Sequence, residues 1–296
     1  MLGDFLYITY DTLNISIFNQ EDTFMTKAKK TVETPVTPGL KSKADIVANW
    51  LPRYTGCPLE EFEPYVLLTN FSKYVRMFSA MHDNAPIYGE DKAMQACTAS
   101  GITMINFGMG SPMAATVMDL LSAIAPQAVL FLGKTGGLKK KIPLGELILP
   151  IAAVRGEGTS NDYFPPEVPS LPAFALQKAI STTIRDYSLD YWTGTVYTTN
   201  RRVWEHDKAF KKYLKSIRAM AVDMETATIF SVGFANKIPT GALLLVSDQP
   251  MVPDGVKTAE SDLAVTEKYV ETHLKIGIDA LKQLINKGLT VKHLKF

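Results

Sequence analysis

Three carboxylates in apolar segments are the side chains of this sequence that are best suited to catalysis or ligand binding. Asp223 and Glu225 lie in AVDMETATIF (residues 221–230), where most of the other residues are apolar. Asp248 lies in VSDQP, directly after the apolar run GALLLVS. A buried carboxylate without a partner is costly, so each needs hydrogen-bond donors or a ligand that supplies them.

Each carboxylate has a structural interpretation beside a functional one. Asp223 is predicted to cap the helix that follows it. Glu225 could be stabilised by the dipole of that helix, or it could accept hydrogen bonds from ligand hydroxyls. Asp248 is predicted to be an acid in a ligand crevice, because crevices form at the carboxyl ends of strands in α/β sheets. The alternative is an ordinary turn aspartate before Pro250.

A glycine-rich turn, GMGSP, separates a predicted strand from a predicted helix. Glycines there let a ligand approach the backbone, and the helix N-terminus offers N–H groups to an oxygen-rich or anionic ligand. Ser111 is predicted to cap this helix, with Pro112 in its first turn. The turn adds Gly108, Met109 and Gly110, with Ser111, to the candidate site, although a plain tight turn is the alternative.

Two familiar nucleotide-binding motifs are excluded by single residues. GKT follows a predicted strand, but Ala128 stands where a P-loop requires its first glycine. GMGSPM has Met113 in place of the third glycine of a dinucleotide fingerprint. We therefore expect neither a triphosphate P-loop nor a Rossmann cofactor, and no cofactor of any kind.

Strand-like and helix-like segments alternate along the chain, which predicts an α/β fold. We expect a three-layer α/β/α domain over residues 41–296, with a mixed central sheet flanked by helices. The predicted strands are YVLLT, GITMINF, QAVLFLG, ELILPIAAV, WTGTVYTT, AMAVD and GALLLVS. The predicted helices are KADIVANWL, SPMAATVMDLLSAI, PAFALQKAISTTIRDY, METATIFSVGFAN and a long segment from Thr266 to Gly288.

Composition narrows the class of protein. The 296 residues carry a formal net charge of +1, which gives no global field for nucleic acid or an anionic membrane. Cys57 and Cys97 have neither the spacing of metal ligands nor that of a disulfide framework. We therefore expect no metal, and we expect the protein in a reducing compartment, the cytoplasm. Residues 1–40 are predicted to be a disordered or non-native extension, with Met25 as the true initiator.

The order GMG, FLGKTGG, DME and VSD resembles the nucleoside phosphorylase and nucleosidase superfamily, whose members cleave the N-glycosidic bond of nucleosides. The resemblance covers about residues 41–287. RGEGTSNDY and TGTVYTTNRRVWE resemble, more narrowly, those members that hydrolyse AMP to adenine and ribose 5-phosphate. The resemblance implies AMP and water as reactants and a homo-oligomer, a hexamer with sites near subunit contacts. It implies no partnership with nucleic acid or membrane.

By this resemblance, Glu225 and Met224 occupy the ribose site and Asp248 shares a proton with N7 of the purine. Cleavage of the C1′–N9 bond leaves positive charge on the sugar and negative charge on adenine. Anionic character near the ribose and a proton donor at the base therefore suit the reaction. Asp248 would need a raised pKa to act as the acid at neutral pH.

The attacking group is expected to be water. Phosphorylases of this superfamily have an arginine two positions before the glycine of the strand-end motif, where this chain has Phe131. Their early phosphate loop is also missing, since Asn70 stands near its expected glycine. Glu157 is a candidate for the base that activates water.

A 5′-phosphate must be met by cations or N–H groups, and arginine suits it through its bidentate fork. The candidates are Arg155, Arg201, Arg202 and Lys134, with Ser111 and Thr159 as neutral donors. Tyr197 and Trp204 could stack on adenine or belong to the core. Thr135, Thr199 and Ser247 complete the predicted substrate-binding set. Two other functions stay open: cleavage of an unphosphorylated purine nucleoside, by hydrolysis or phosphorolysis, and AMP sensing without catalysis.

Overall fold

The computed structural model describes residues 41–287. The predictions for residues 1–40, including an initiator at Met25, lie outside this range. Over the described residues, no helix has the length and apolar character needed to cross a membrane.

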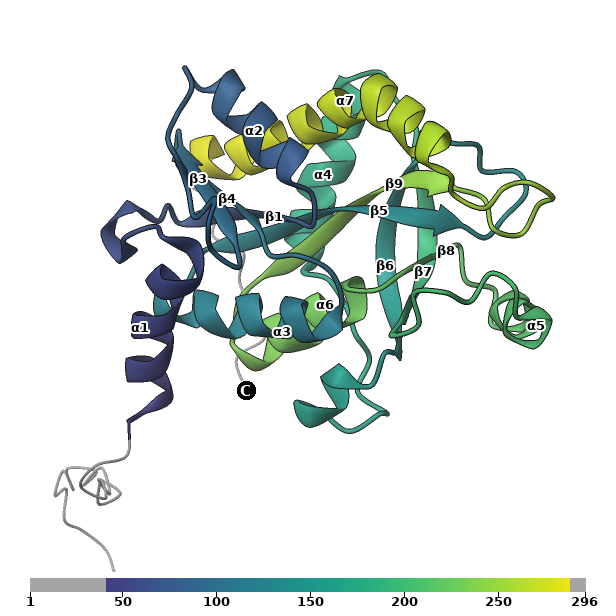
Figure 1. Ribbon diagram of the computed structural model, residues 1–296, viewed down its shortest axis with the longest axis horizontal. Helices are drawn as coiled ribbons and strands as arrows, with labels where there is room; N and C mark the ends of the chain where they lie inside the picture. The colour runs from purple at the N-terminus through teal and green to yellow at the C-terminus, as the bar shows by residue number, and fades with distance from the viewer. Residues whose placement is uncertain (1–40, 288–296) are drawn as a thin grey trace, which may run out of the picture. The chain divides into compact units, whose positions relative to one another are not determined.

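A nine-stranded mixed sheet runs through the described part of the chain (Figure 1). Its order is β2-β3-β4-β1-β5-β8-β7-β6-β9, and β9 also pairs with β5. The strands are β1 Tyr65–Thr69, β2 Ile87–Tyr88, β3 Gln95–Ala99, β4 Ile102–Asn106, β5 Ala128–Gly137, β6 Leu147–Gly156, β7 Trp192–Thr199, β8 Ala221–Asp223 and β9 Thr240–Asp248.

Helices cover both faces of this sheet, as Figure 1 shows. One group, α1, α3 and α6, packs on one face, and α2, α4 and α7 pack on the other. The helices are α1 Lys43–Thr55, α2 Ser72–Met81, α3 Ser111–Leu120, α4 Phe174–Asp186, α5 Lys208–Ser216, α6 Thr226–Ala235 and α7 Ala259–Lys287, with short 3-10 turns at Leu59–Glu61, Leu121–Ala123 and Thr159–Asp162. The predicted α/β/α layering is confirmed.

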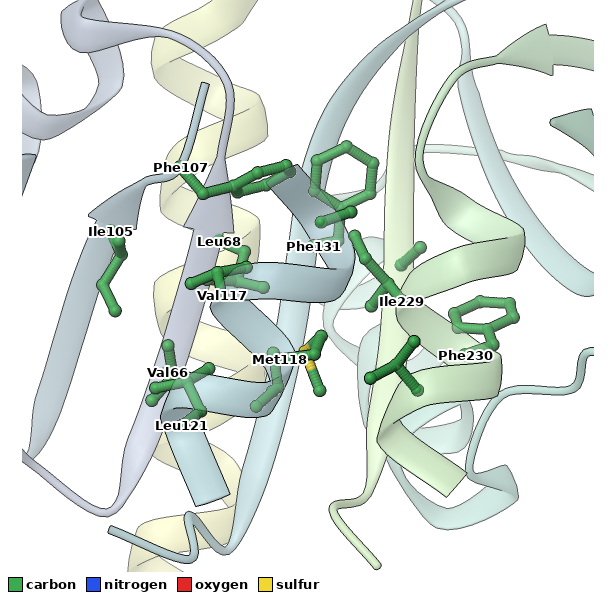
Figure 2. Packing of buried hydrophobic residues seen from close by; sticks show 14 of the residues in the cluster. Val66, Leu68, Ile105, Phe107, Val117, Met118, Leu121, Phe131, Ile229 and Phe230 are labelled. Atoms are coloured by element: carbon green, nitrogen blue, oxygen red, sulfur yellow. The ribbon is translucent and has the colours of Figure 1, made fainter. Parts of the chain in front are cut away.

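Alternation along the central strands divides the core between the two faces. Val66 and Leu68 of β1 face the α3 and α6 side, whereas Leu67 faces the α2 and α7 side. Figure 2 shows Leu68 beside Val117 of α3 and Val66 beside Leu121, the residue that follows α3. Successive strand side chains point to opposite faces, so a strand covered on both faces is apolar throughout. This explains the continuous apolar runs of the sequence.

Part of the sheet closes on itself, which the sequence did not predict. β5 pairs in parallel with β9 and, at its last two residues, antiparallel with β8. β7 joins β8 to β6, and β6 returns to β9 through two antiparallel pairs. The β5–β9 register shifts between Thr135 and Gly136, where β5 also begins to pair with β8. A Cβ on Gly136 would lie 3.2 Å from both Asp248 Oδ2 and Val222 Cγ1, so a larger residue would crowd both side chains.

Candidate active site

A cleft of about 240 Å³ lies where β1, β5, β7, β8 and β9 end. It gathers segments that are distant in the sequence because the closed part of the sheet brings these strand ends together. Its lining residues are Asn70, Phe71, Met109, Lys134, Thr135, Gly136, Thr199, Arg201, Arg202, Trp204, Glu205, Val222, Asp223, Met224, Glu225, Ser247, Asp248, Lys257 and Asp262.

Glu225 is held at the cleft wall by backbone N–H groups. Its side chain is buried, and the residue is only 3% exposed. Gly110 N donates to Oε1 at 2.7 Å, and Met224 N donates to Oε2 at 3.2 Å. Burial and the neighbouring charge of Asp223 raise the pKa of Glu225 to about 8, although these N–H groups and the Asn70 amide oppose the shift. The carboxylate is therefore fixed in position and costly to ionise.

Asp223 is not the N-cap residue of α6, contrary to the prediction, because Glu225 occupies that position, but its carboxyl group bonds the first residue of the helix. Its Oδ2 accepts a hydrogen bond from Thr226 N at 2.9 Å and another from the Thr226 hydroxyl. Its Oδ1 accepts from Thr198 Oγ1 at 2.7 Å. Burial raises the pKa of Asp223. Asp223 also lines the cleft, so Asp223 and Glu225 form a pair of buried acids beside the ligand space.

Asp248 lies on a different part of the wall, at the end of β9. Its side chain is 13% exposed. Ser247 Oγ donates to Oδ1 at 2.9 Å, and Lys257 Nζ lies 3.8 Å from the same oxygen. Burial raises the pKa of Asp248, while Lys257 acts in the opposite direction. A half-hidden carboxyl with a raised pKa and few fixed donors is suited to giving and taking a proton.

Lys134 is committed to an ion pair beneath the cleft. Its side chain is 3% exposed, and Nζ lies 2.9 Å from Asp262 Oδ1 and 2.6 Å from Thr266 Oγ1. Lys257 Nζ lies 3.6 Å from the same Asp262 oxygen. Asp262 thus lies between two lysines and ties the first turn of α7 to β5. Burial lowers the pKa of Lys134.

The loop after β7 supplies the more exposed cations. Arg201 Nη1 donates to Asp207 Oδ2 at 3.0 Å, and Arg202 Nη1 donates to Glu205 Oε1 at 3.3 Å. About half of each arginine side chain is exposed. Each guanidinium carries five N–H donors, so both retain donors for an anion. Trp204, between them and α5, is buried against Phe210.

Residues 64–283 match the family model described as the phosphorylase superfamily. The chain belongs to the phosphorylase superfamily. AMP nucleosidase of Escherichia coli (strain K12) is 30% identical over 284 residues, which cover 80% of this chain and 58% of that protein. The chain thus spans little more than half the length of this relative. Uridine phosphorylase of Treponema pallidum (strain Nichols) is 25% identical over 197 residues, covering 63% of this chain and 74% of that protein.

Solved structures agree with the superfamily fold. The crystal structure of AMP nucleosidase from Bacteroides thetaiotaomicron VPI-5482 superimposes with a TM-score of 0.74 at 58% sequence identity, covering 83% of this chain and 100% of that one. Purine nucleoside phosphorylase from Toxoplasma gondii shares the fold at a TM-score of 0.69 and 19% identity, over 78% of this chain and 95% of that one. The predicted nucleoside phosphorylase-like architecture is confirmed.

The structure brings most of the predicted site residues of this superfamily member to one cleft. The two predicted acids line it, and so do several of the predicted binding residues. These binding residues are Met109, Lys134, Thr135, Thr199, Arg201, Arg202, Trp204, Met224 and Ser247.

Arg155 lies outside this set of cleft residues. Its guanidinium donates six hydrogen bonds within residues 160–168, four of them to backbone carbonyls. Because the guanidinium donors of Arg155 are already used, this side chain stabilises the loop and has none left for a ligand. Thr159 belongs to the 3-10 turn of that loop and does not line the cleft either.

Other predicted residues also lie behind the cleft wall. Tyr197 is buried against Phe210 and Tyr213 of α5. Glu157 is buried, and its Oε1 accepts hydrogen bonds from Ser160 N and Thr228 Oγ1. Neither residue lines the ligand space.

The GMGSP turn acts mainly through its backbone. Gly110 holds Glu225, while neither Gly108 nor Ser111 lines the cleft. Ser111 does not cap α3, contrary to the prediction: its Oγ donates to Met224 O at 2.6 Å, and Gly110 occupies the N-cap position. The hydroxyl joins the turn to the DME segment because the two meet in space.

Sequence reasoning missed four polar residues that line the cleft: Asn70, Glu205, Lys257 and Asp262. They come from a turn, two loops and the first turn of α7, outside any motif. Asn70 had drawn attention only as a departure from a phosphate loop. A search for polar residues directly after each strand would have found Asn70 but not the other three.

Proposed function

We propose that this protein is an AMP nucleosidase, which hydrolyses AMP to adenine and ribose 5-phosphate. The observation that carries the proposal is the pair of carboxyl groups that line one cleft, Glu225 buried and Asp248 partly buried. Both have raised pKa values, yet only Glu225 is fixed by two backbone donors. The similarity to the two AMP nucleosidases supports the substrate.

Two roles follow from this difference. Glu225 holds the ribose hydroxyls and places anionic or strongly polar oxygen near the sugar as positive charge develops at C1′. Asp248, protonated, gives its proton to N7 as the C1′–N9 bond breaks and the electron pair moves to the purine. Ser247 orients the Asp248 carboxyl through its 2.9 Å hydrogen bond. Met224 lies at the ribose end, beside Glu225.

The 5′-phosphate is assigned to Arg201 or Arg202. Both line the cleft and retain unused guanidinium donors, whereas the Lys134 ammonium already bonds Asp262 and Thr266. A guanidinium can bind a phosphate through two parallel N–H···O bonds. Trp204 and Thr199 lie next to this cationic segment and complete the binding surface.

Water is the proposed nucleophile because the position expected to bind inorganic phosphate holds no cation. Phe131 is fully buried, and its ring packs against Phe107 at a centroid distance of 5.9 Å (Figure 2). A phosphate dianion has no counter-charge there. The reaction needs neither metal nor organic cofactor in this scheme.

A cytoplasmic homo-oligomer, a hexamer, is the proposed state of the protein, with AMP and water rather than nucleic acid or membrane as partners. Ile151, Leu171 and Phe174 are large apolar side chains that are more than half exposed, Phe174 by 82%. They form one apolar surface with Leu149 and Tyr191. Contiguous exposed apolar surface of this kind is typical of subunit contacts. Light scattering of the purified protein tests the assembly.

The deciding experiment measures adenine release from AMP and from adenosine, each with and without inorganic phosphate. The products ribose 5-phosphate and ribose 1,5-bisphosphate are separated by chromatography. We expect adenine and ribose 5-phosphate from AMP at a rate that does not depend on added phosphate. Phosphate-dependent cleavage of adenosine would make the protein a phosphorylase, and AMP binding without cleavage would make it a sensor.

A further inference from the structure

Two short segments of the chain carry a strong local excess of positive charge. Residues 138–142 and 200–219 contain ten lysines and arginines and two acids, a formal net charge of +8, whereas the whole chain has +1. The two acids, Glu205 and Asp207, are already paired with Arg202 and Arg201. The rest of the chain is therefore net negative, and its positive charge is concentrated in one place.

The other eight cations of these segments have no anionic partner in the described part of the chain. Within residues 41–287, no carboxylate lies at ion-pair distance from any of them. All eight reach the surface, and six are fully exposed. We call them the cationic surface: Lys139, Lys140, Lys141, Lys208, Lys211, Lys212, Lys215 and Arg218.

The cationic surface is held next to the cleft by a small apolar cluster. Leu138, which precedes the first three lysines, packs in this cluster with Trp204, Val222 and Leu214 of α5. Trp204 and Val222 also line the cleft. A backbone hydrogen bond of 2.9 Å from Leu138 N to Met220 O joins the two charged segments. Figure 1 shows α5 apart from the helices that cover the sheet, so its lysines are free to face solvent.

The first turn of α5 adjoins one of the arginines assigned to the 5′-phosphate. Arg201 Cζ lies 5.4 Å from the centroid of the Phe210 ring. The helix has nine residues, so it is about 13 Å long, and its lysines lie within about 20 Å of this arginine. Charges are screened over about 30 Å at 0.01 M salt and about 8 Å at 0.15 M. The cationic surface therefore acts on a charge in the cleft at low ionic strength, and weakly at high ionic strength.

The lining of the cleft does not supply this attraction by itself. It contains four cationic side chains and five carboxyl groups. Each of the four cations lies 2.9 to 3.8 Å from a carboxylate oxygen. Their unused N–H groups can hold a phosphate at contact distance, but an ion pair exerts little net force on an anion farther away. A distant anion is thus attracted mainly by the unpaired cations outside the cleft.

We propose that the cationic surface attracts dianionic AMP to the cleft and so makes the protein select the nucleotide over uncharged adenosine. This inference rests on the proposed AMP hydrolysis. A phosphate monoester carries a charge of about −2 at neutral pH, whereas adenosine carries none. A potential of opposite sign around a cleft raises the local concentration of a charged ligand and its rate of encounter. The cationic surface touches no reacting atom, so it promotes the capture of AMP and leaves the cleavage step unchanged.

Removal of charge from α5 tests the inference. Lys208, Lys212 and Lys215, all exposed, are changed together to glutamine and, in a second variant, to glutamate, both of which suit a helix. Steady-state kinetics with AMP are measured at about 0.01 M and about 0.15 M ionic strength. At the lower value we expect kcat/KM to fall about three- to fivefold with glutamine and about 10- to 25-fold with glutamate, at unchanged kcat. At the higher value both losses should be below about threefold.

Two controls separate attraction at a distance from damage to the site. Adenine, the uncharged product, should inhibit the wild type and both variants with the same inhibition constant, because the cleft itself is unaltered. The triple variant Lys178→Gln, Lys237→Asn and Lys282→Gln removes the same charge from α4, the segment after α6, and α7. None of these three residues lines the cleft, and kcat/KM for AMP should stay within about twofold. Asparagine is used at position 237 because its φ is 58°, which asparagine tolerates.

The outcomes distinguish this inference from the function on which it rests. If the wild type releases no adenine from AMP, the proposed function fails, and the dissociation constant of AMP from calorimetry replaces KM in the same comparison. An unchanged kcat/KM in the glutamate variant at low ionic strength would overturn the inference. A loss that persists in full at high ionic strength, or that adenine shares, would also overturn it, since either result would mean that the substitutions alter the cleft itself.

Discussion

Glu225 and Asp248 both line the cleft, but their surroundings leave the two side chains different freedom to move. Glu225 accepts two backbone hydrogen bonds and cannot turn without breaking them. Asp248 has one hydroxyl donor and a lysine 3.8 Å away. A fixed carboxyl group suits the recognition of hydroxyls, and a less constrained one suits proton exchange.

Asp248→Asn removes the proposed acid while keeping the side-chain shape. We expect kcat for AMP to fall about 10²- to 10⁴-fold, the usual contribution of general acid catalysis, with AMP still bound. Steady-state kinetics and calorimetric titration with AMP measure the two effects. Asp190→Asn, an exposed aspartate paired with Arg185, is the control. Unchanged turnover in Asp248→Asn would remove Asp248 from the mechanism.

Glu225→Gln should change how stability depends on pH. The folded protein holds the Glu225 proton up to about pH 8, whereas the unfolded chain releases it near the ordinary value of 4.5. Stability is therefore lost as pH rises through this window, at up to about 1.4 kcal/mol per pH unit. We expect urea titrations between pH 6.5 and 8 to show this slope in the wild type and not in Glu225→Gln.

Glu271→Gln, at an exposed ion pair with Lys275, should keep the wild-type slope. An identical slope in Glu225→Gln would mean that Glu225 ionises in the folded protein as it does in the unfolded chain.

At this scale the sequence predicted residues of the cleft better where they follow an apolar strand. Asp248 was found because it ends an apolar strand, and Glu225 because its surroundings are apolar. Arg155 and Tyr197 had suitable chemistry, but their positions depend on which way a strand faces and which loop folds over it. Those depend on tertiary contacts that residue type does not encode.

The segment after β6 is an element organised by one side chain. Arg155 donates hydrogen bonds to the carbonyl groups of Ser160, Phe164, Pro165 and Val168. It thereby fixes the loop after β6, which consists of a short 3-10 turn and the irregular stretch that follows it. This loop packs between α3 and α6, where the Tyr163 hydroxyl donates to Asp119 Oδ2 at 2.6 Å. The arginine thus fixes this loop against α3 and α6.

Arg155→Ala is expected to lower the free energy of unfolding by about 2 kcal/mol, because several carbonyls lose a charged donor. Arg155→Lys should recover little of it, since one ammonium group cannot reproduce the fork. Urea denaturation measures the loss, and proteolysis should become faster within residues 157–168. Arg185→Ala, at an exposed ion pair, serves as control. An unchanged free energy of unfolding in Arg155→Ala would show that the loop keeps its conformation without the arginine.

Elements were predictable where their periodicity was clear. WTGTVYTT is β7 to the residue, and YVLLT is β1. The helix α2 was missed because no polar cap precedes it: Phe71 is its N-cap residue and makes no side-chain cap bond. The helix α5 was missed because only Leu214 of its nine residues is buried. Short helices with such weak signals are specified by their packing.

Across the whole domain, His273 joins three elements at one buried ring. It lies on α7, where Nε2 hydrogen-bonds to Leu243 O of β9 at 3.0 Å and Nδ1 to the Tyr74 hydroxyl of α2 at 2.8 Å. The carbonyl can only accept, so Nε2 carries the proton of the neutral ring. Burial lowers the pKa of His273 to about 4. The unfolded chain takes up a proton near pH 6.5, so stability present above that pH is lost as pH falls towards 4.

His273→Gln should therefore be less stable than the wild type at pH 7, with a difference that narrows as pH falls from 6.5 to 4.5. Between pH 4.5 and 6.5, the stability that His273 contributes rises with pH, whereas the stability that Glu225 contributes falls. The free energy of unfolding of the wild type should therefore change little with pH in this range. Urea midpoints of the wild type, His273→Gln and the exposed-site control His206→Gln measure this. A constant difference would show that His273 titrates normally.

The closed ring of strands could not be read from the sequence, because each strand has the same pattern whether the sheet stays open or closes. Closure depends on β5 pairing with both β9 and β8 at Gly136, a position where the sequence shows only a pair of glycines. The layers follow from local patterns, and the ring follows from contacts between distant segments.

That ring has a consequence for how the protein is made. The central strand β5 needs β9 and β8 beside it, and both are synthesised well after it, at residues 240–248 and 221–223. Contacts between segments so distant in sequence slow folding, and the ribosome adds only about 5–20 residues per second. The strand that completes the ring is also the one that ends in Asp248. A nascent chain therefore acquires Asp248 only as its sheet closes, so the cleft cannot form before the sheet is complete.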